Sequence, residues 1–163
     1  MYLHILQVHV VTSCYIVPHE GGHSKVHAAR ACPLFHGRQV FSDLSVHGTR
    51  VDIVRGREVE VSEVWYGRAI LFFRAFENVL EWEEGEQVWK SIPHELVFLR
   101  WYNVTGYSDN VKCPILDWES TRRGEPSVQV RSIASLIGVE MMLPKTSATR
   151  GKELWYRNRY IKL

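Results

Sequence analysis

The sequence predicts a mainly β protein, folded as a small, partly open antiparallel barrel with short helical turns. Its apolar segments are short and rich in Val, Ile, Phe, Trp and Tyr. They are bounded by Gly, Pro, Asn, Asp and Ser, which is the pattern of strands joined by turns. Almost no segment has the 3.6-residue apolar period of an amphipathic helix. With 163 residues, 45% of them hydrophobic and 23% charged, the chain can bury one core without metals or disulfides.

Six segments have strand character. In chain order they are residues 40–46, 58–76 with a break near Gly67, 95–104, 127–134, 137–143 and 154–161. The turn signals that separate them are His47-Gly48, Arg55-Gly56, 106–110, Arg123-Gly124 and 144–151. A helical turn is expected near residues 132–137. Short strands with polar turns predict an antiparallel barrel or sandwich.

The chain is expected to have two parts. Residues 25–163 form a single β-rich domain, and residues 1–24 form an apolar, histidine-containing leader that is either a strand pair or an ill-ordered segment. The leader lacks the positively charged start and small-residue cleavage site of a signal peptide. Polar residues also interrupt it before it reaches the roughly 18 apolar residues of a membrane span. No membrane partner is therefore expected.

Charge is unevenly distributed along a chain whose net charge is only +2. Residues 77–95 carry six glutamates against one lysine, net −5, and residues 145–163 carry six basic residues against one glutamate, net +5. Because the acidic run joins the two strongest strand segments, it is expected to be a solvated hairpin loop. The alternative is a surface for a basic partner such as a histone tail.

A histidine- and cysteine-containing segment raises the question of a metal. The potential ligands are Cys14, His19, His23, His27 and Cys32. Thiolate and imidazole are the usual zinc ligands, but the segment has no C-x2-C pair and contains Gly21-Gly22, which oppose a helix. We expect no metal and no cofactor. The odd number of cysteines, three, argues against a disulfide framework and for the nucleus or cytoplasm.

Motifs of catalysis are missing from the sequence. It contains no G-x-S-x-G elbow, no phosphate-binding glycine loop and no pair of carboxylates held at a fixed spacing. The sequence therefore predicts a protein that is not an enzyme.

Two Trp-Tyr doublets, 65–66 and 101–102, are the strongest functional signal. Neighbouring strand residues point to opposite faces, so one member of each doublet can lie in the core while the other is displayed. Displayed aromatic rings can hold a cation, and the candidate ligand-binding residues are Tyr66, Tyr102, Trp118 and Trp155. The alternative is that the doublets simply pack. The expected core residues are Trp65, Leu71, Phe73, Val97, Leu99, Trp101, Ile133, Ile137 and Val139.

Basic residues offer a second kind of site. The candidate nucleic-acid-binding residues are Arg122, Arg123, Arg157, Arg159 and Lys162, with Tyr156 and Tyr160 interleaved. Lysines and arginines in a turn and strand can contact phosphates, while tyrosines stack on bases. A solvated strand face has the same sequence pattern, so both interpretations stand at this point.

The order of motifs resembles a known family. "VWYGRAILFFRAF", "HELVFLRWYNV", "CPILDW", "VQVRSIASLIGVEMMLP" and "LWYRNRYI" follow one another. The series resembles the carboxy-terminal region of eukaryotic DNA-transposon proteins, notably fungal KDZ-type and plant CACTA-type proteins. In those proteins the catalytic acidic residues lie far upstream, so the resemblance implies a module separate from a transposase-type core.

The central strands also resemble a bromo-adjacent homology (BAH) domain. Gly67-Arg68 matches its first strand motif and Arg100-Trp101-Tyr102 its second, while Asn103-Val104 replaces the usual Arg-Pro. The resemblance implies a BAH-like barrel that binds chromatin or a partner protein in the nucleus. Nucleic-acid binding is the alternative function, and a zinc-binding protein that uses the histidine- and cysteine-containing segment is a third.

Overall fold

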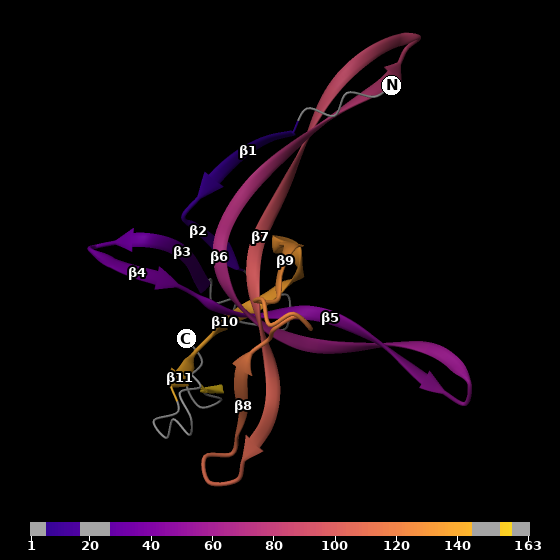
Figure 1. The fold of residues 1–163 in the computed structure, drawn as a ribbon. Coiled ribbons are helices and arrows are strands. Elements are labelled where there is room, and N and C mark those ends of the chain that lie inside the picture. The colour runs from indigo at the N-terminus through magenta and orange to yellow at the C-terminus, as the bar shows by residue number, and fades with distance from the viewer. Residues whose placement is uncertain (1–5, 17–26, 145–153, 158–163) are drawn as a thin grey trace, which may run out of the picture.

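The computed structural model describes residues 6–16, 27–144 and 154–157, and these lie almost entirely in strands (Figure 1). The predicted mainly β, antiparallel barrel is confirmed, because seven strands form a nearly closed sheet in the order β10-β5-β6-β7-β8-β12-β11. Strand β1 adds to β6 and β9 adds to β7, outside this path. Strands β2, β3 and β4 form a second, three-stranded sheet.

The first six strands are β1 (Leu6–Val11), β2 (Ser13–Ile16), β3 (His27–Phe35), β4 (Arg38–Phe41), β5 (Asp43–Val54) and β6 (Arg57–Glu83). They are followed by β7 (Glu86–Ser108), β8 (Cys113–Trp118), β9 (Val128–Ser132), β10 (Leu136–Glu140), β11 (Met142–Pro144) and β12 (Trp155–Arg157). A 3-10 turn, η1 (Ile133–Ser135), confirms the expected helical turn. Among the described residues, no helix has the length and apolar character needed to span a membrane.

The expectation that the acidic run forms a loop is wrong. Strands β6 and β7 continue through it as a two-stranded hairpin, paired as far as Glu83 and Glu86. Lys90 allows this, because its ammonium group binds the carboxylates of Glu81 and Glu83 on the same face of the hairpin. Opposite charges across neighbouring strands stabilise a sheet. Residues 113–118, which were not predicted as a strand, form β8.

Tight turns of the X-Gly type close three of the hairpins. His36-Gly37, Arg55-Gly56 and Glu84-Gly85 all have two successive positive φ angles, from 49° to 89°. Two positive φ angles identify the type I′ turn, whose twist matches that of the flanking strands. Only Arg55-Gly56 was predicted as a turn, although the same dipeptide signal is present in the other two.

The core lies between the barrel sheet and β3. Val97, Leu99 and Trp101 are buried as predicted, together with Phe72 and Leu44. Leu71 and Phe73 are only partly buried, because the register of β6 against β7 shifts between Ala69 and Leu71. This bulge moves the following side chains to the opposite face. It also replaces the predicted break at Gly67, where β6 is continuous.

Three other predicted core residues come from the chain after β9. Ile133, Ile137 and Val139 are partly buried, and Ile133 and Val139 pack against the core cluster. Trp65 is also partly buried and packs against the same cluster. These residues therefore form the margin of the core rather than its centre.

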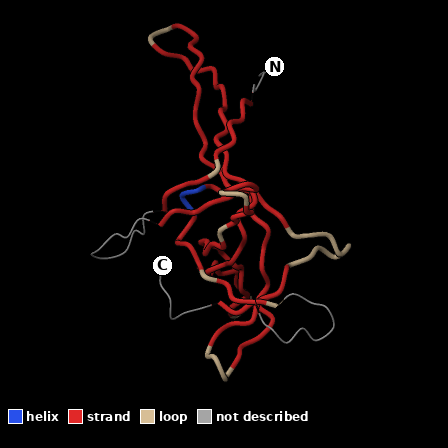
Figure 2. Tube along the Cα trace, turned by 90° about the vertical axis from the view of Figure 1, so that its left-hand side faces the viewer, coloured by secondary structure: helices blue, strands red, loops and turns tan. Residues whose placement is uncertain are grey.

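Strands β6 and β7 separate from each other at one defined point. They pair from the hairpin tip to Tyr66 and Tyr102. Beyond these residues β6 continues along β5, and β7 continues along β8. The sheet therefore divides into a fork, and its hairpins project in different directions from the body (Figures 1 and 2).

Candidate interaction site

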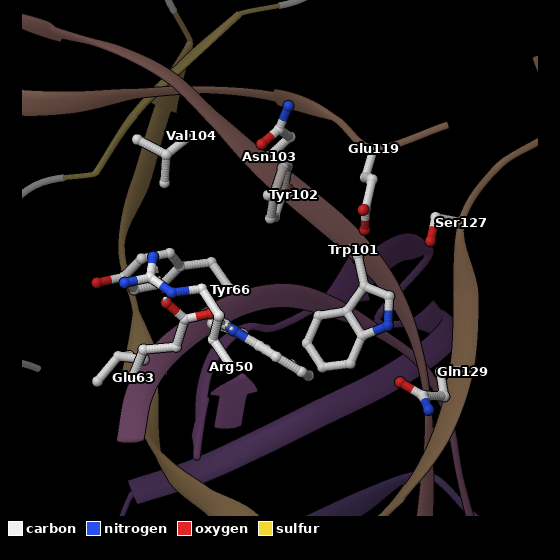
Figure 3. Close-up of a pocket in the computed structure, with 12 residues that line it drawn as sticks. Arg50, Glu63, Tyr66, Trp101, Tyr102, Asn103, Val104, Glu119, Ser127 and Gln129 are labelled. Atoms are coloured by element: carbon white, nitrogen blue, oxygen red, sulfur yellow. Dashed lines mark hydrogen bonds and ion pairs between the residues drawn. The ribbon is translucent and has the colours of Figure 1, made fainter. Parts of the chain in front are cut away.

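A cavity of about 610 Å³ lies in the fork between β6 and β7 (Figure 3). Its volume is within the range of small-ligand sites in proteins. The lining residues are Arg50, Glu63, Val64, Trp65, Tyr66, Trp101, Tyr102, Asn103, Val104, Glu119, Ser127 and Gln129. The cavity thus joins both Trp-Tyr doublets to polar groups from β5, β9 and the segment between β8 and β9.

Two indole rings form the apolar part of the cavity. Trp65 meets Trp101 edge to face, with ring centroids 5.7 Å apart. Gly48 makes this position available, because a β carbon there would lie 2.3 Å from the Trp65 ring. The Trp65 indole nitrogen donates to Glu63, which fixes the ring further. Arg131 covers these rings, with its guanidinium carbon 5.1 Å from the Trp65 centroid.

The polar groups of the cavity are of two kinds. Arg50 is already neutralised, because it binds Asp52 at 2.9 Å and Glu63 at 3.5 Å. By contrast, the side chains of Glu119, Ser127 and Gln129 have no hydrogen-bond or ion-pair partner within the described parts of the chain. Figure 3 shows these three around the Trp101 indole. They leave a carboxylate, a hydroxyl and a carboxamide available to a ligand.

Backbone hydrogen bonds hold two of these groups in place. The Glu119 N–H donates to the Trp101 carbonyl, and the Trp101 N–H donates to the Ser127 carbonyl. The Ser127 N–H donates in turn to the Glu119 carbonyl, at 3.0 Å. Glu119 and Ser127 are therefore positioned by strand-like pairing rather than by a free loop.

The four candidate aromatic residues do come together, in a cluster of which Tyr66 and Tyr102 also border the cavity. Tyr66, Tyr102 and Leu116 form a buried cluster against which Trp118 and Trp155 pack. The Tyr102 and Trp118 rings are stacked at 4.3 Å. The expectation that Tyr66 and Tyr102 are displayed is wrong, since only 9% and 6% of these residues is exposed. Strand β8 pairs with β7, and β12 pairs with β8, and side chains of both strands pack against the two tyrosines.

Arginines of the chain itself lie over the rings of this cluster. The Arg68 guanidinium carbon is 5.1 Å from the Trp118 centroid and 5.0 Å from that of Trp155. Arg100 lies 4.1 Å from Trp118, and Arg157 lies 4.8 Å from Tyr66. These are cation–π distances. An external cation would therefore have to displace one of these arginines.

Asp43 anchors the arginine that touches most of these rings. Its carboxylate accepts hydrogen bonds from Arg68 Nε at 2.8 Å and Nη2 at 3.1 Å, and from the Tyr102 hydroxyl at 2.8 Å. Burial, followed by the Asp43 charge, raises the pKa of Tyr102, so its hydroxyl remains a donor. Sequence reasoning missed Asp43. Its signal in the sequence is a carboxylate among the apolar residues Phe41, Leu44 and Val46, and a carboxylate in a buried position requires a partner.

The candidate nucleic-acid-binding residues are not gathered in the described parts of the chain. Arg157 forms a two-pronged ion pair with Glu140, at 2.9 and 3.0 Å. Arg122 and Arg123 are exposed in the turn between β8 and β9. Arg159 and Lys162 lie outside the described residues, as do Tyr160 and the end of the predicted strand 154–161. Of the three candidate arginines that the structure describes, Arg157 thus already has its charge neutralised by Glu140.

The possible metal ligands are separated where they are described. Cys14 pairs with Ala29, three positions along β3 from Cys32, so about 10 Å separates the two cysteines. His19 and His23 lie outside the described residues, and no metal-binding group of side chains occurs among the described ones. All three cysteines are free thiols. Burial, with a smaller effect of Glu95, raises the pKa of Cys14 to about 11.

Comparison with known proteins adds no relative to this description. No family model, curated protein or solved structure matches the chain. The interpretation of the site therefore depends on the geometry of the fork cavity and of the aromatic cluster.

Proposed function

We propose that this chain is a non-catalytic interaction module of a transposon-derived protein, which binds chromatin or another partner protein in the nucleus. The observation that carries the proposal is the fork cavity, with its ligand-sized volume, its indole wall and its unpartnered polar groups. The resemblance to BAH domains and to transposon proteins supports the same class of function.

The chemistry of the cavity favours a peptide with a basic side chain. The Gln129 carboxamide and the Ser127 hydroxyl can each donate to and accept from a peptide group. The Glu119 carboxylate can accept from a lysine or arginine, and a charged acceptor strengthens such a bond. Trp101 offers apolar surface to the aliphatic stem of that side chain. A partly enclosed site of this kind can hold one anchor residue of a protein partner.

The same geometry gives nucleic acid less support. Glu63 and Glu119 line the cavity, and carboxylates repel phosphates. Of the candidate nucleic-acid-binding residues that the structure describes, Arg122, Arg123 and Arg157 do not line the cavity, and Arg157 is paired with Glu140. Among the described candidate residues, Arg122 and Arg123 would carry a contact to nucleic acid, and both lie in the exposed turn between β8 and β9.

The test is binding of the purified protein to an array of lysine-rich histone peptides and to labelled duplex DNA, each across a salt series. The decisive variant is Glu119→Lys, which reverses the one unpaired charge of the cavity. Glu125→Lys is the matched control, because Glu125 is exposed in the same turn and does not line the cavity. We expect Glu119→Lys to weaken peptide binding by roughly tenfold or more, and Glu125→Lys to change it little.

Two other outcomes would contradict the proposal. DNA binding that falls steeply with salt and ignores Glu119→Lys would support the nucleic-acid alternative, since phosphate contacts release counterions. Peptide binding that responds equally to both variants would indicate general electrostatic attraction rather than a site in the fork.

A further inference from the structure

The outer part of the β6–β7 hairpin, residues 77–92, forms a second surface, and none of its residues lines the fork cavity. Strand β1 pairs with β6 only as far as Glu77, and β9 pairs with β7 only from Leu96 onward. Among the described strands, nothing else pairs with the outer part. Figure 2 shows it standing away from the body. We call it the arm.

One face of the arm is apolar and exposed. The register pairs Trp82 with Gln87 and Leu80 with Trp89, so these side chains share a face. Trp82 is 70% exposed and Trp89 is 58% exposed. Two large exposed aromatic residues on the same face of a hairpin mark an interaction surface more often than single scattered hydrophobic residues do.

The opposite face and the tip are acidic. Lys90 satisfies Glu81 and Glu83 on the opposite face. Glu84 and Glu86, at the tip, have no ion-pair partner among the residues that the structure describes. Their charges lie within two to three residues of Trp82 and Trp89 along the chain. The arm thus presents an apolar patch bordered by uncompensated carboxylates.

Charge decides between the classes of partner that such a patch could bind. Exposed tryptophans also occur on surfaces that bind nucleic acid or lipid. Phosphates and anionic headgroups would be repelled here, because residues 77–95 carry a net charge of −5. The same repulsion opposes pairing of the arm with the arm of a second copy. A partner with both apolar and basic side chains fits the patch.

We propose that the arm docks a basic, extended segment of a partner protein. Within the described part of the chain no other strand pairs with the edges of the arm, and open strand edges readily accept another strand. A strand with alternating side chains places its apolar residues on Trp82 and Trp89 along one face. Its lysines or arginines then reach the carboxylates at the tip. This surface is separate from the fork cavity and acts independently of it.

The test uses three synthetic dodecapeptides: alternating lysine–valine, alternating lysine–serine and alternating glutamate–valine. Binding is measured by titration calorimetry and by tryptophan fluorescence. The lysine–valine peptide is expected to bind at least roughly tenfold more tightly than either of the others, because only it has both the charge and the apolar face. Equal binding of lysine–serine would reduce the arm to an electrostatic patch and overturn the proposal.

Two pairs of variants locate the binding. Trp82→Ser with Trp89→Ser removes the apolar patch, and Ile53→Ser with Val54→Ser is its control on the β5–β6 hairpin, where both residues are exposed. A charge-reversal pair is built from Glu84→Lys and Glu86→Lys. Its control is Glu58→Lys with Glu60→Lys. These two glutamates also lie on β6, are exposed, and have no ion-pair partner among the described residues.

The arm variants are expected to lose roughly tenfold or more in affinity for the lysine–valine peptide, and the controls to keep it. Equal losses in arm and control variants would refute the assignment. So would tryptophan-dependent binding to phosphatidylserine vesicles or to duplex DNA. A dimer in analytical ultracentrifugation that the tryptophan variant dissolves would make a second copy the occupant instead. Glu119→Lys removes the share of lysine–valine binding that the fork contributes, so the loss in the arm variants should also appear when they are made in the Glu119→Lys protein.

Discussion

Replacing Asp43 with asparagine should destabilise the protein strongly, because Asp43 forms a largely buried ion pair with an arginine enclosed by aromatic rings. The change keeps the size of the side chain and removes its charge. One of the two oxygens becomes an amide nitrogen, which is a donor facing the Arg68 donors. Arg68 then remains against Tyr102, Trp118 and Trp155 without its ion pair.

The magnitude follows from burial. The Asp43 side chain is 10% exposed and that of Arg68 is 23% exposed, so water can replace little of the lost interaction. Breaking a buried pair by removing one partner decreases the free energy of unfolding by roughly 3–5 kcal/mol. We expect a value near the lower limit, about 3 kcal/mol, because Arg68 keeps some contact with solvent and its ring contacts remain. Tyr102→Phe, which removes one hydrogen bond to Asp43, should decrease it by about 1 kcal/mol.

Equilibrium unfolding in urea, followed by tryptophan fluorescence and by far-UV circular dichroism, measures these differences. The control is Asp52→Asn, because Asp52 pairs with Arg50 in solvent, where both side chains are well exposed. Exposed pairs contribute little, so the control should change the unfolding free energy by less than about 1 kcal/mol. If Asp43→Asn and Asp52→Asn had equal effects, the Asp43 pair would not be desolvated, and the reasoning about the cluster would be wrong.

Three further changes test the packing and the chemistry of the described residues. Gly48→Ala should decrease the unfolding free energy by roughly 1–3 kcal/mol, because its β carbon would collide with Trp65. Gly106→Ala, where a β carbon meets nothing, should stay within about 0.5 kcal/mol, and equal effects of the two would exclude the collision as the cause. Phe72→Ala should decrease the unfolding free energy by roughly 3–5 kcal/mol, since Phe72 is fully buried, and a loss below about 1 kcal/mol would place it outside the core. The pKa of Cys14 is raised to about 11, so its alkylation by iodoacetamide should keep accelerating as pH rises from 8 to 10, where an ordinary thiol levels off. Mass spectrometry of its peptide checks this, and a plateau near pH 9 would contradict the raised pKa.

Much of the fold was predictable because strand and turn signals are local. The apolar alternation of residues 95–104 identified the buried face of β7, and Val97, Leu99 and Trp101 lie there. The same rule failed on β6 after Ala69. The position of a bulge depends on how two strands pair with each other, so it could not be predicted from the sequence of either strand alone.

The candidate aromatic residues were also predicted, but not their surroundings. The cluster forms as expected, because β6, β7, β8 and β12 are consecutive in the sheet. These strands carry Tyr66, Tyr102, Trp118 and Trp155 in that order. Their burial by β8 and β12, and the arginines over their rings, depend on residues far along the chain. Glu119 gave no signal in the sequence, because its role arises only where β6 and β7 separate.

By itself, the sequence determined that this protein is built of strands and turns, that glycine occurs in several of the turns, and that its charge is concentrated in one acidic and one basic segment. These properties depend on residues that are close together in the sequence, because strand and turn preferences are local. Only the tertiary structure decided that the acidic segment is an amphipathic arm, that the tyrosines are covered, and that a cavity opens between two strands. Those outcomes depend on long-range pairing, because a side chain's exposure is set by the strands that come to lie over it.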